Sequence, residues 1–571
     1  MAISPTDQSL FASFSSEKEG LGLRRWIALA LFAFLIYLPG RASLPPLDRD
    51  ESRYMEATAQ MLHTGNYVDV RFQDQPRYLQ PAGIYWLEAL AADLSDGRTS
   101  RSAWAYRIPS LLAATANVLL TAAIGAALFG ADVGLAGAAM FALAVLVTAE
   151  ARMATIDTTL LLAVLLAMWS AIRARLDAER GRPTSPAVAA LYWVALGCGL
   201  MFKGPVVLIP GWGMPIALAA IERSTGWWRR LRPLWGIPLM LLIVVPWCVA
   251  IWIVSHGTFF ERAVGTNFLG KVASGQQAHG LPPGFHLVVF LLAFWPGSFF
   301  AMRALPWVIG QRRSLQVRLL ACWIVPHWLV FEAIATKLPH YVLPTYPAIA
   351  LLAAASLLRG GPVAAFGARG WWRGWLGVYG ALWLLAGLAL ALAGPLLLWF
   401  VQHEVRVLPI VTGALAGLAV LSGAVLVARG QALRGLVATG AGALVAYLGI
   451  FAAVIQNLTT IWLSPRIALA FDQVRPCADS VLASTSFSEP SLVFAVGQDT
   501  RLVDAAGAAA FLATDRRCGV ALVGTRDQPA FEHALADRGL TVRLLGRVQG
   551  VNYSNGRHLD LGFFAVAGET P

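Results

Sequence analysis

The sequence alternates between long apolar segments and short polar ones over most of its length. Apolar segments of about 17–25 residues are long enough to cross a bilayer as a helix. The pattern predicts thirteen such spans, which are 24–40, 105–129, 133–149, 157–173, 188–202, 205–221, 235–254, 286–309, 319–335, 342–358, 375–400, 408–428 and 434–456. We therefore expect an all-α, polytopic membrane bundle over residues 24–456.

Arginines in the short connecting segments predict how this bundle is oriented. When the N-terminal tail (1–23) is placed in the cytoplasm, every arginine-rich short loop lies on the cytoplasmic side, and these loops are 173–182, 223–232, 312–318, 359–373 and 429–434. Short loops rich in arginine remain on that side. An odd number of spans then places residues 457–571 outside. The first span lacks an evident small-residue cleavage site, so we expect an anchor and not a signal peptide.

The pattern changes after residue 456. Strand-like runs and helical stretches alternate there, with strands expected at 480–484, 500–504 and 519–523 and helices at 504–513 and 528–538. A last pair of runs, 542–548 and 558–566, brackets the turn-forming Asn555-Gly556. This predicts a small α/β domain over 457–571, outside the membrane. Its Cys477 and Cys518 form a disulfide in an oxidising compartment or remain two buried thiols, and both alternatives are open.

The composition agrees with a membrane protein. Hydrophobic residues make up 57% of the 571 residues and charged residues only 13%, with a mean hydropathy of +0.62. A disordered chain is excluded, and a single large soluble enzyme would need more charge on its surface. The net charge of +12 comes largely from the arginines of the short loops. We therefore expect no nucleic-acid partner.

Polar residues that persist in such an apolar chain are the candidates for chemistry. The first outer loop (41–104) is far longer than the other loops between spans and contains the pair Asp50-Glu51. A short amphipathic stretch (54–63) follows, and it is predicted to lie along the membrane surface. The remaining outer loops are short, apart from a polar one at 256–285.

Each candidate has a functional interpretation and a structural one. Asp50 and Glu51 form either a reactive carboxylate pair or an acidic pair that favours a helix N-terminus. Asp157 opens a span, so it either caps that helix or holds a rigid functional carboxylate. Lys203 precedes Gly-Pro at a span end, where it either snorkels or faces a cavity.

Three further candidates lie in the later outer loops and the span between them. His279 and His340 are either solvated or functional. Glu332 lies within a predicted span, where a lone charge is costly, and is expected to pair with Lys337 or to serve the site.

Taken together, these segments resemble the membrane glycosyltransferases related to protein O-mannosyltransferases and to lipid A aminoarabinose transferases. The matching segments occur in order along almost the whole membrane part, and they are Asp50 to Tyr54, Arg77-Tyr78 to Tyr85-Trp86, Ala151 to Asp157, Lys203-Gly204-Pro205, Gly270-Lys271 to His279-Gly280, and Lys337 to Pro344. The resemblance implies a GT-C fold with interfacial helices in the first outer loop. It also implies a sugar donor built on a polyprenyl phosphate.

The resemblance also implies roles for individual residues. Asp50 and Asp157 correspond to the catalytic carboxylates, and Glu51, the second member of the Asp50-Glu51 pair, is expected to be catalytic as well. The donor phosphate and its sugar are expected to contact Arg53, Tyr54, Arg77, Gln80, Tyr85, Lys203, Lys271, His279, Lys337 and Tyr341. Relatives usually have a lysine where this chain has Gln80. Glutamine supplies no charge, and a charge-assisted contact is roughly twice as strong as a neutral one, so either Arg77 compensates or the donor is held differently.

The expected function is the transfer of a sugar, with inversion, from a polyprenyl-phosphate donor to lipid A, another envelope glycolipid or, less in keeping with the pattern, a protein. The reaction is placed at the outer face of a bacterial inner membrane. It requires no cofactor, although a divalent cation is compatible with the acidic pair. Two alternatives belong to other classes. A transporter or flippase of a lipid-linked sugar would place its ionisable groups near the midplane, and a sensory protein would use the outer domain to bind a partner.

Overall fold

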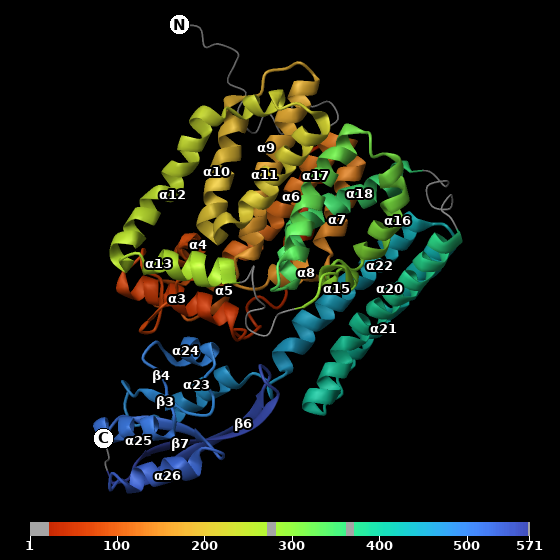
Figure 1. Cartoon of the computed structure of the whole chain (residues 1–571). Helices are drawn as coiled ribbons and strands as arrows, with labels where there is room; N and C mark the ends of the chain where they lie inside the picture. The colour runs from red at the N-terminus through yellow and green to blue at the C-terminus, as the bar shows by residue number, and fades with distance from the viewer. Residues whose placement is uncertain (1–21, 271–280, 361–369, 569–571) are drawn as a thin grey trace.

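The computed structural model describes residues 22–270, 281–360 and 370–568. Most of them belong to a helical bundle, with a small α/β domain at one end of it (Figure 1). The bundle helices are α2 (Leu23–Tyr37), α6 (Ile108–Phe129), α7 (Ala131–Ala142), α8 (Val145–Glu150), α9 (Asp157–Glu179), α10 (Pro186–Lys203), α11 (Leu208–Glu222), α12 (Pro233–Ser255), α15 (Phe285–Ala293), α16 (Gly297–Gly310), α17 (Leu315–Ala333), α18 (Tyr346–Arg359), α20 (Gly370–Leu397), α21 (Val407–Ala428) and α22 (Ala432–Gly449). We call the end that carries the α/β domain the domain-side end.

The helices identify the chain as a multi-pass membrane protein. Eight helical stretches of the described residues are long and apolar enough to cross a membrane. The expected number of thirteen spans is therefore not confirmed. The stretch predicted at 133–149 divides into α7 and α8, and that at 286–309 divides into α15 and α16 at Trp295-Pro296. Both breaks occur inside continuous apolar runs, where hydropathy alone does not mark a helix end.

Small residues allow the helices of the bundle to approach closely. Where α6 meets α7, a Cβ atom added to Gly125 would lie 2.6 Å from the Cα atom of Gly134, so any larger residue would push the two helices apart. A different use of glycine follows Lys203. Gly204 has a φ of +63°, which ends α10 and turns the chain into η1 (Gly204–Val207).

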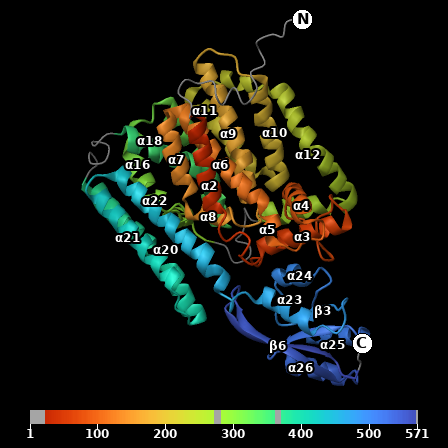
Figure 2. The ribbon, with the colours of Figure 1, turned by 180° about the vertical axis from the view of Figure 1, so that it is seen from behind.

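Two helices of the first long loop lie across the domain-side end of the bundle, and they are α3 (Asp50–Thr64) and α4 (Gly83–Asp96) (Figures 1 and 2). A short hairpin of β1 (Arg71–Phe72) and β2 (Gln75–Pro76) lies between them in the chain, and α5 (Ala103–Tyr106) follows. The amphipathic stretch predicted here forms α3, whose Met55, Ala59 and Leu62 are all buried. Ten of its residues are buried, which exceeds one helix face, because the α/β domain covers α3 from the other side.

The α/β domain contains a five-stranded sheet in the order β4-β3-β5-β7-β6. Its strands are β3 (Leu482–Ser484), β4 (Arg501–Leu502), β5 (Val520–Gly524), β6 (Val542–Asn552) and β7 (Arg557–Val566), and its helices are α23 (Leu463–Val474), α24 (Pro490–Val496), α25 (Ala505–Thr514) and α26 (Gln528–Ala536). Strands β3, β4 and β5 are parallel, whereas β7 runs antiparallel to β5 and β6. A helical bundle with a small C-terminal sheet was predicted, and it is confirmed.

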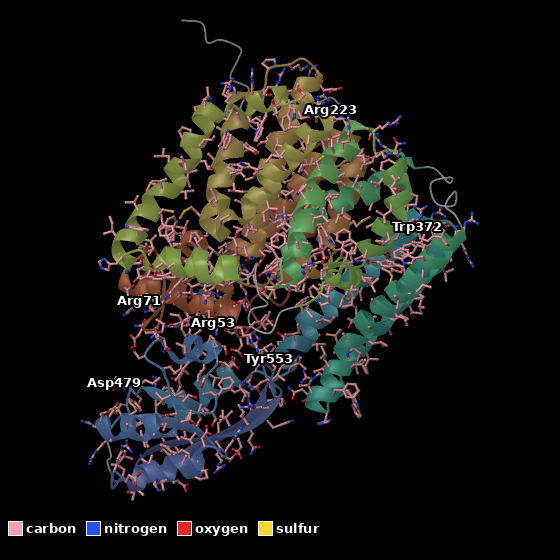
Figure 3. All side chains as sticks on the ribbon, in the orientation of Figure 1. Arg53, Arg71, Arg223, Trp372, Asp479 and Tyr553 are labelled. Carbon is pink, nitrogen blue, oxygen red and sulfur yellow. A yellow bond between two sulfur atoms is a disulfide. The ribbon has the colours of Figure 1, made fainter. Side chains whose placement is uncertain are left out.

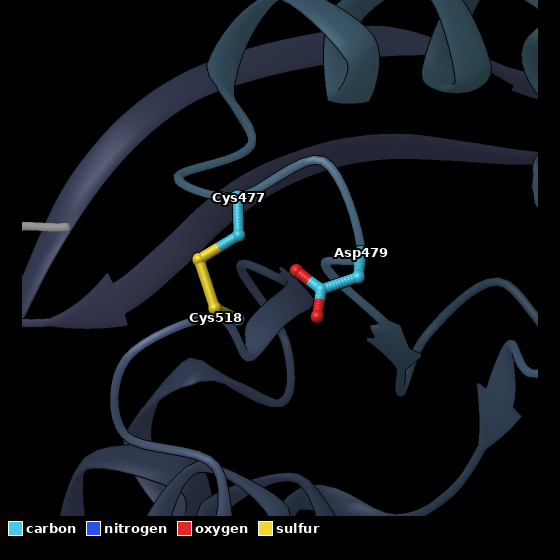
Figure 4. A group of neighbouring side chains, drawn as sticks. All are labelled: Cys477, Asp479 and Cys518. Atoms are coloured by element: carbon cyan, nitrogen blue, oxygen red, sulfur yellow. A yellow bond between two sulfur atoms is a disulfide. The ribbon is translucent and has the colours of Figure 1, made fainter.

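A disulfide joins the two cysteines of this domain. The Cα atoms of Cys477 and Cys518 are 5.3 Å apart, and the carboxylate of Asp479 lies beside the bridge (Figure 4). Of the two alternatives open from the sequence, the disulfide is the one that forms. It ties the segment after α23 to the turn before β5.

Candidate functional site

A cavity of about 430 Å³ opens at the domain-side end of the bundle. Its walls are mainly apolar and come from α10, α12, α17 and the short α13 (Thr258–Phe260), including Trp247, Phe259 and Phe331. Polar side chains also line it, and they are Gln80, Asp157, Lys203, His340 and Tyr341. The cavity therefore combines an apolar compartment with a group of charged and hydrogen-bonding side chains.

An ion pair between Asp157 and Lys203 dominates these polar groups. The Lys203 Nζ atom lies 2.6 Å from the Asp157 Oδ1 atom, and both side chains are largely buried. Asp157 is the first residue of α9 and Lys203 is the last of α10, so two helix ends bring them together. The Lys203 ammonium also lies 5.7 Å from the ring centre of Tyr341, which η4 (Pro339–Thr345) contributes. The ammonium is thus held by one carboxylate and one aromatic ring at the cavity wall.

His340 and Glu150 extend this group. His340 places its Nδ1 atom 3.9 Å from Glu150 Oε1 and its Nε2 atom 4.0 Å from Asp157 Oδ1. Glu150 is buried at the end of α8, and its other oxygen accepts a hydrogen bond of 2.9 Å from Thr155. These three residues offer ligand atoms that all lie within 4.8 Å of one another, so they could hold a divalent cation. Such a cation would share Asp157 with Lys203.

A cluster of aromatic and polar side chains from α3, α4 and their connection borders the cavity. The Gln80 amide donates to the Tyr54 hydroxyl at 2.6 Å and to the Tyr85 hydroxyl at 3.3 Å. Arg77 donates from Nε to the same Tyr85 hydroxyl at 2.9 Å and lies 4.9 Å from the Tyr54 ring centre. The place where the resemblance implies a lysine is therefore taken by an amide that two tyrosine hydroxyls hold.

A second cavity, of about 490 Å³, shares Leu79 with the first. The described residues that line it include Arg53, Arg77 and Arg262. No aspartate or glutamate is among these described lining residues. Arg53 lies on α3 where the bundle meets the α/β domain (Figure 3). Burial, together with the positive charge of Arg77, lowers the pKa of Arg53 below its ordinary value. Three guanidinium groups in one cavity, two of them on facing segments of the first long loop, favour an anionic ligand.

Asp50 and Glu51 have different surroundings although they are neighbours in the sequence. Asp50 is exposed at the start of α3 and lies within electrostatic reach of Arg53, Arg77 and Tyr341. Glu51 is buried and forms an ion pair with Arg107, at 2.7 and 2.9 Å for its two oxygens. It also accepts from the backbone N–H groups of Leu47, at 2.9 Å, and Ala154, at 2.8 Å.

Glu51 was expected to be a catalytic carboxylate, and the structure requires a correction. Its two oxygens are occupied by Arg107 and two backbone donors, and it lines neither cavity. Because Ala154 precedes Asp157 in the same short loop, Glu51 ties the loop of Asp50 to the loop of Asp157.

Lys337 also differs from the expectation. It is buried, and its ammonium donates to the backbone carbonyls of Phe331, Glu332 and Ile334, which closes the end of α17. The Glu332 carboxylate instead accepts from the backbone N–H of Gly284 at 2.8 Å. The expected pairing of the two side chains is therefore wrong, and Lys337 does not line the cavity. Lys271 and His279 lie outside the described residues.

Sequence patterns did not mark every residue that the site contains. Glu150, Arg107 and Arg262 were not singled out, although each is an ionisable residue at or near a span end, which is a usable signal. His340 was considered, and the structure places it against Asp157. By contrast, Arg53, Tyr54, Arg77, Gln80, Tyr85, Asp157, Lys203 and Tyr341 do lie together around the two cavities, directly or through one hydrogen bond.

The fold is a helical membrane bundle of the kind that the resemblance to GT-C membrane glycosyltransferases implies. A helical bundle, interfacial helices after the first span and a carboxylate–lysine pair beside an apolar cavity occur together here. Residues 23–256 match the family described as dolichyl-phosphate-mannose-protein mannosyltransferase. This match includes both acidic segments and Lys203.

Among known proteins, the chain is similar to undecaprenyl phosphate-α-4-amino-4-deoxy-L-arabinose arabinosyl transferases. It is 26% identical to the enzyme of Pectobacterium carotovorum over 352 residues and 27% identical to that of Pseudomonas aeruginosa over 348, and each alignment covers 59% of this chain. The chain matches 60% of the length of these relatives.

The similarity of fold extends over nearly the whole chain. The crystal structure of ArnT from Cupriavidus metallidurans bound to undecaprenyl phosphate superimposes with a TM-score of 0.72 over 96% of this chain and 98% of that one, at 18% identity. Its apo form gives a TM-score of 0.67. The predicted resemblance to this group of transferases is thereby confirmed, including the GT-C fold.

Proposed function

We propose that this protein transfers a sugar, with inversion, from a polyprenyl-phosphate donor to lipid A or another envelope glycolipid. The observation that carries the proposal is the Asp157–Lys203 pair, beside Tyr341, at the wall of a mainly apolar cavity. An isoprenoid phosphate needs both an apolar compartment and fixed cations. The printed names of the relatives, and a similar fold solved with undecaprenyl phosphate, support this choice of donor.

The donor is expected to bind with its tail against Trp247, Phe259 and Phe331 and its phosphate near Lys203. Arg53 and Arg77 approach from the second cavity. When the bond between the anomeric carbon and the phosphate oxygen breaks, the phosphate keeps the bonding electrons. Fixed cations stabilise that charge without reorganising, so they lower the barrier. The leaving group then needs no proton.

Asp50 and Asp157 divide the remaining work. Asp157 holds the Lys203 ammonium in place. Asp50 is exposed and close to the arginines, so it can approach the acceptor or the developing positive charge of the sugar. An acceptor hydroxyl loses its proton to Asp50, whereas an acceptor phosphate is already ionised and needs no base. Attack from the face opposite the leaving phosphate inverts the anomeric centre.

The same proposal assigns the two sides of the membrane. The N-terminus is cytoplasmic, and the domain-side end with its α/β domain faces the periplasm of a bacterial inner membrane. The arginine-rich loops at the other end of the bundle support this orientation. A disulfide in the α/β domain is consistent with an oxidising compartment.

The test uses the full chain in nanodiscs with a radiolabelled polyprenyl-phosphate sugar and lipid A as acceptor. We expect labelled lipid A from the wild type and at least a 100-fold lower rate from Lys203→Met. Arg312→Met serves as the control, because Arg312 is an exposed cation in the loop after α16. Donor binding without any transfer by the wild type, to lipid A or to other envelope glycolipids, would reject the proposal and favour a transporter.

A further inference from the structure

The segment that leads into α3, residues Leu47–Asp50, is held by the α/β domain from one side. The Asp48 backbone N–H donates to the Tyr553 hydroxyl at 2.5 Å, and the Asp48 carboxylate accepts from the Ser491 backbone N–H at 3.2 Å. The next residue, Arg49, donates from its guanidinium to the Ser554 carbonyl at 3.3 Å. Two segments of the domain, the β6–β7 turn and the start of α24, thus hold two successive residues.

The same segment is fixed from the other side by α3 itself. The Leu47 N–H donates to the Glu51 carboxylate at 2.9 Å, and the Ser52 N–H donates to the Leu47 carbonyl at 3.0 Å. Glu51 is in turn fixed by Arg107. Residues 47 and 48 are therefore clamped between the bundle and the domain.

Arg49 adopts a backbone conformation that a side chain disfavours. Its φ is +72° and its ψ is −99°, a region that residues other than glycine rarely enter. Such a conformation persists only where surrounding contacts impose it. Here the contacts are those of Asp48 and Arg49 with the domain. Without them, rotation about the Arg49 backbone would relax the turn.

Asp50 is the residue that this rotation would move. It follows Arg49 directly, it begins α3, and it lies within electrostatic reach of Arg53 and Arg77. Tyr553 lines neither cavity, and its ring packs against Trp462 with ring centres 5.5 Å apart. Its hydroxyl instead contacts Asp48, the residue before the strained turn at Arg49, where the bundle meets the α/β domain (Figure 3).

We infer that the α/β domain takes part in the reaction by positioning Asp50, and that Tyr553 is the positioning residue, acting through Asp48 and the strained turn at Arg49. This inference rests on the proposed function. It gives the domain a defined task that does not depend on contact with either substrate. The domain sets the direction of the Asp50 carboxylate through its contacts with the two preceding residues.

The experiment compares Tyr553→Phe with the wild type in the nanodisc transfer assay, because phenylalanine keeps the packing against Trp462 and removes only the hydroxyl. We expect kcat to fall at least 10-fold, KM for the donor to stay within 2-fold and the thermal unfolding midpoint to be unchanged. Ser554→Ala is the matched control, because it also removes a hydroxyl from this turn. It leaves the contact with Arg49 intact, since Arg49 donates to the backbone carbonyl of Ser554. We expect it to behave as the wild type.

A second variant separates positioning from a general structural effect. Arg49→Gly removes the side-chain strain, because glycine adopts a positive φ without steric cost, so the turn no longer depends on the domain contacts to the same extent. If Tyr553 acts through that turn, Arg49→Gly should restore part of the kcat that Tyr553→Phe loses. A double variant as slow as Tyr553→Phe or slower, or a Tyr553→Phe variant with wild-type kcat, would overturn the inference. A wild type that transfers no sugar would instead overturn the proposed function.

Discussion

Substitution of Glu51 distinguishes two roles for this residue. Its buried position favours a structural role, whereas its place beside Asp50 in the sequence favours a catalytic one. The Glu51→Gln substitution keeps the size of the side chain and removes its charge. In the native protein this carboxylate accepts two hydrogen bonds from Arg107 and one each from Leu47 and Ala154. Glutamine offers one acceptor oxygen, and its amide group would face donors.

The size of the effect follows from the burial of the pair. The side chains of Arg107 and Glu51 are 0% and 1% exposed, so the Glu51→Gln substitution would leave the guanidinium buried without a counter-charge. Removing one partner of a buried, hydrogen-bonded ion pair typically costs about 3–5 kcal/mol. We expect a loss of that order in the free energy of unfolding. Transfer activity should fall as well, because the loops of Asp50 and Asp157 lose their link.

The assay measures unfolding in detergent at constant pH together with transfer at a temperature well below the unfolding transition. Glu404→Gln is the control, since Glu404 pairs with Arg406 at the surface, where such a pair is worth about 0–1 kcal/mol. The double variant Glu51→Leu, Arg107→Met removes both charges and should regain part of the lost stability. Wild-type unfolding of Glu51→Gln combined with abolished transfer would refute the structural role and return Glu51 to catalysis.

Three further predictions concern Asp157, Asp48 and the disulfide. Asp157→Asn should lower kcat/KM by roughly 100-fold, because the Lys203 ammonium loses the carboxylate that holds it 2.6 Å away; an unchanged value in the transfer assay would remove this role. Burial raises the pKa of Asp48 from 3.8 to about 6, so the docked domain binds a proton more tightly than the undocked one. Docking of the α/β domain should therefore be strongest below about pH 4 and weaken as the pH rises through 6. Hydrogen exchange of residues 463–566 measures this change, and the Asp48→Asn substitution should abolish it. Reducing the bridge between Cys477 and Cys518, which are 41 residues apart, should destabilise the α/β domain by about 4 kcal/mol, and urea unfolding with and without reductant measures this.

Much of this protein could be predicted without coordinates, because its strongest signals are local. Apolar runs, arginine-rich loops and short strand patterns depend on neighbouring residues, and they led to a helical membrane bundle with a small α/β domain. The importance of Asp157 and of Lys203 could be predicted too, since both residues interrupt apolar segments at span ends, where a charge is rare. Such rarity marks a position as functional but does not say with what it pairs.

The direction of each side chain depended on contacts between distant segments. Asp50 and Glu51 are adjacent, yet a helix turns successive side chains apart, so Asp50 is exposed whereas Glu51 is buried against Arg107, fifty-six residues away. Lys337 is charged and lies in a matching motif, but its nearest acceptors are the carbonyls at the end of α17. The link from Tyr553 to Asp48 joins positions 505 residues apart, and no local pattern carries information over that separation. Contacts between segments that are distant in the sequence therefore decided which polar side chains lie at the candidate site and which ones hold the fold together.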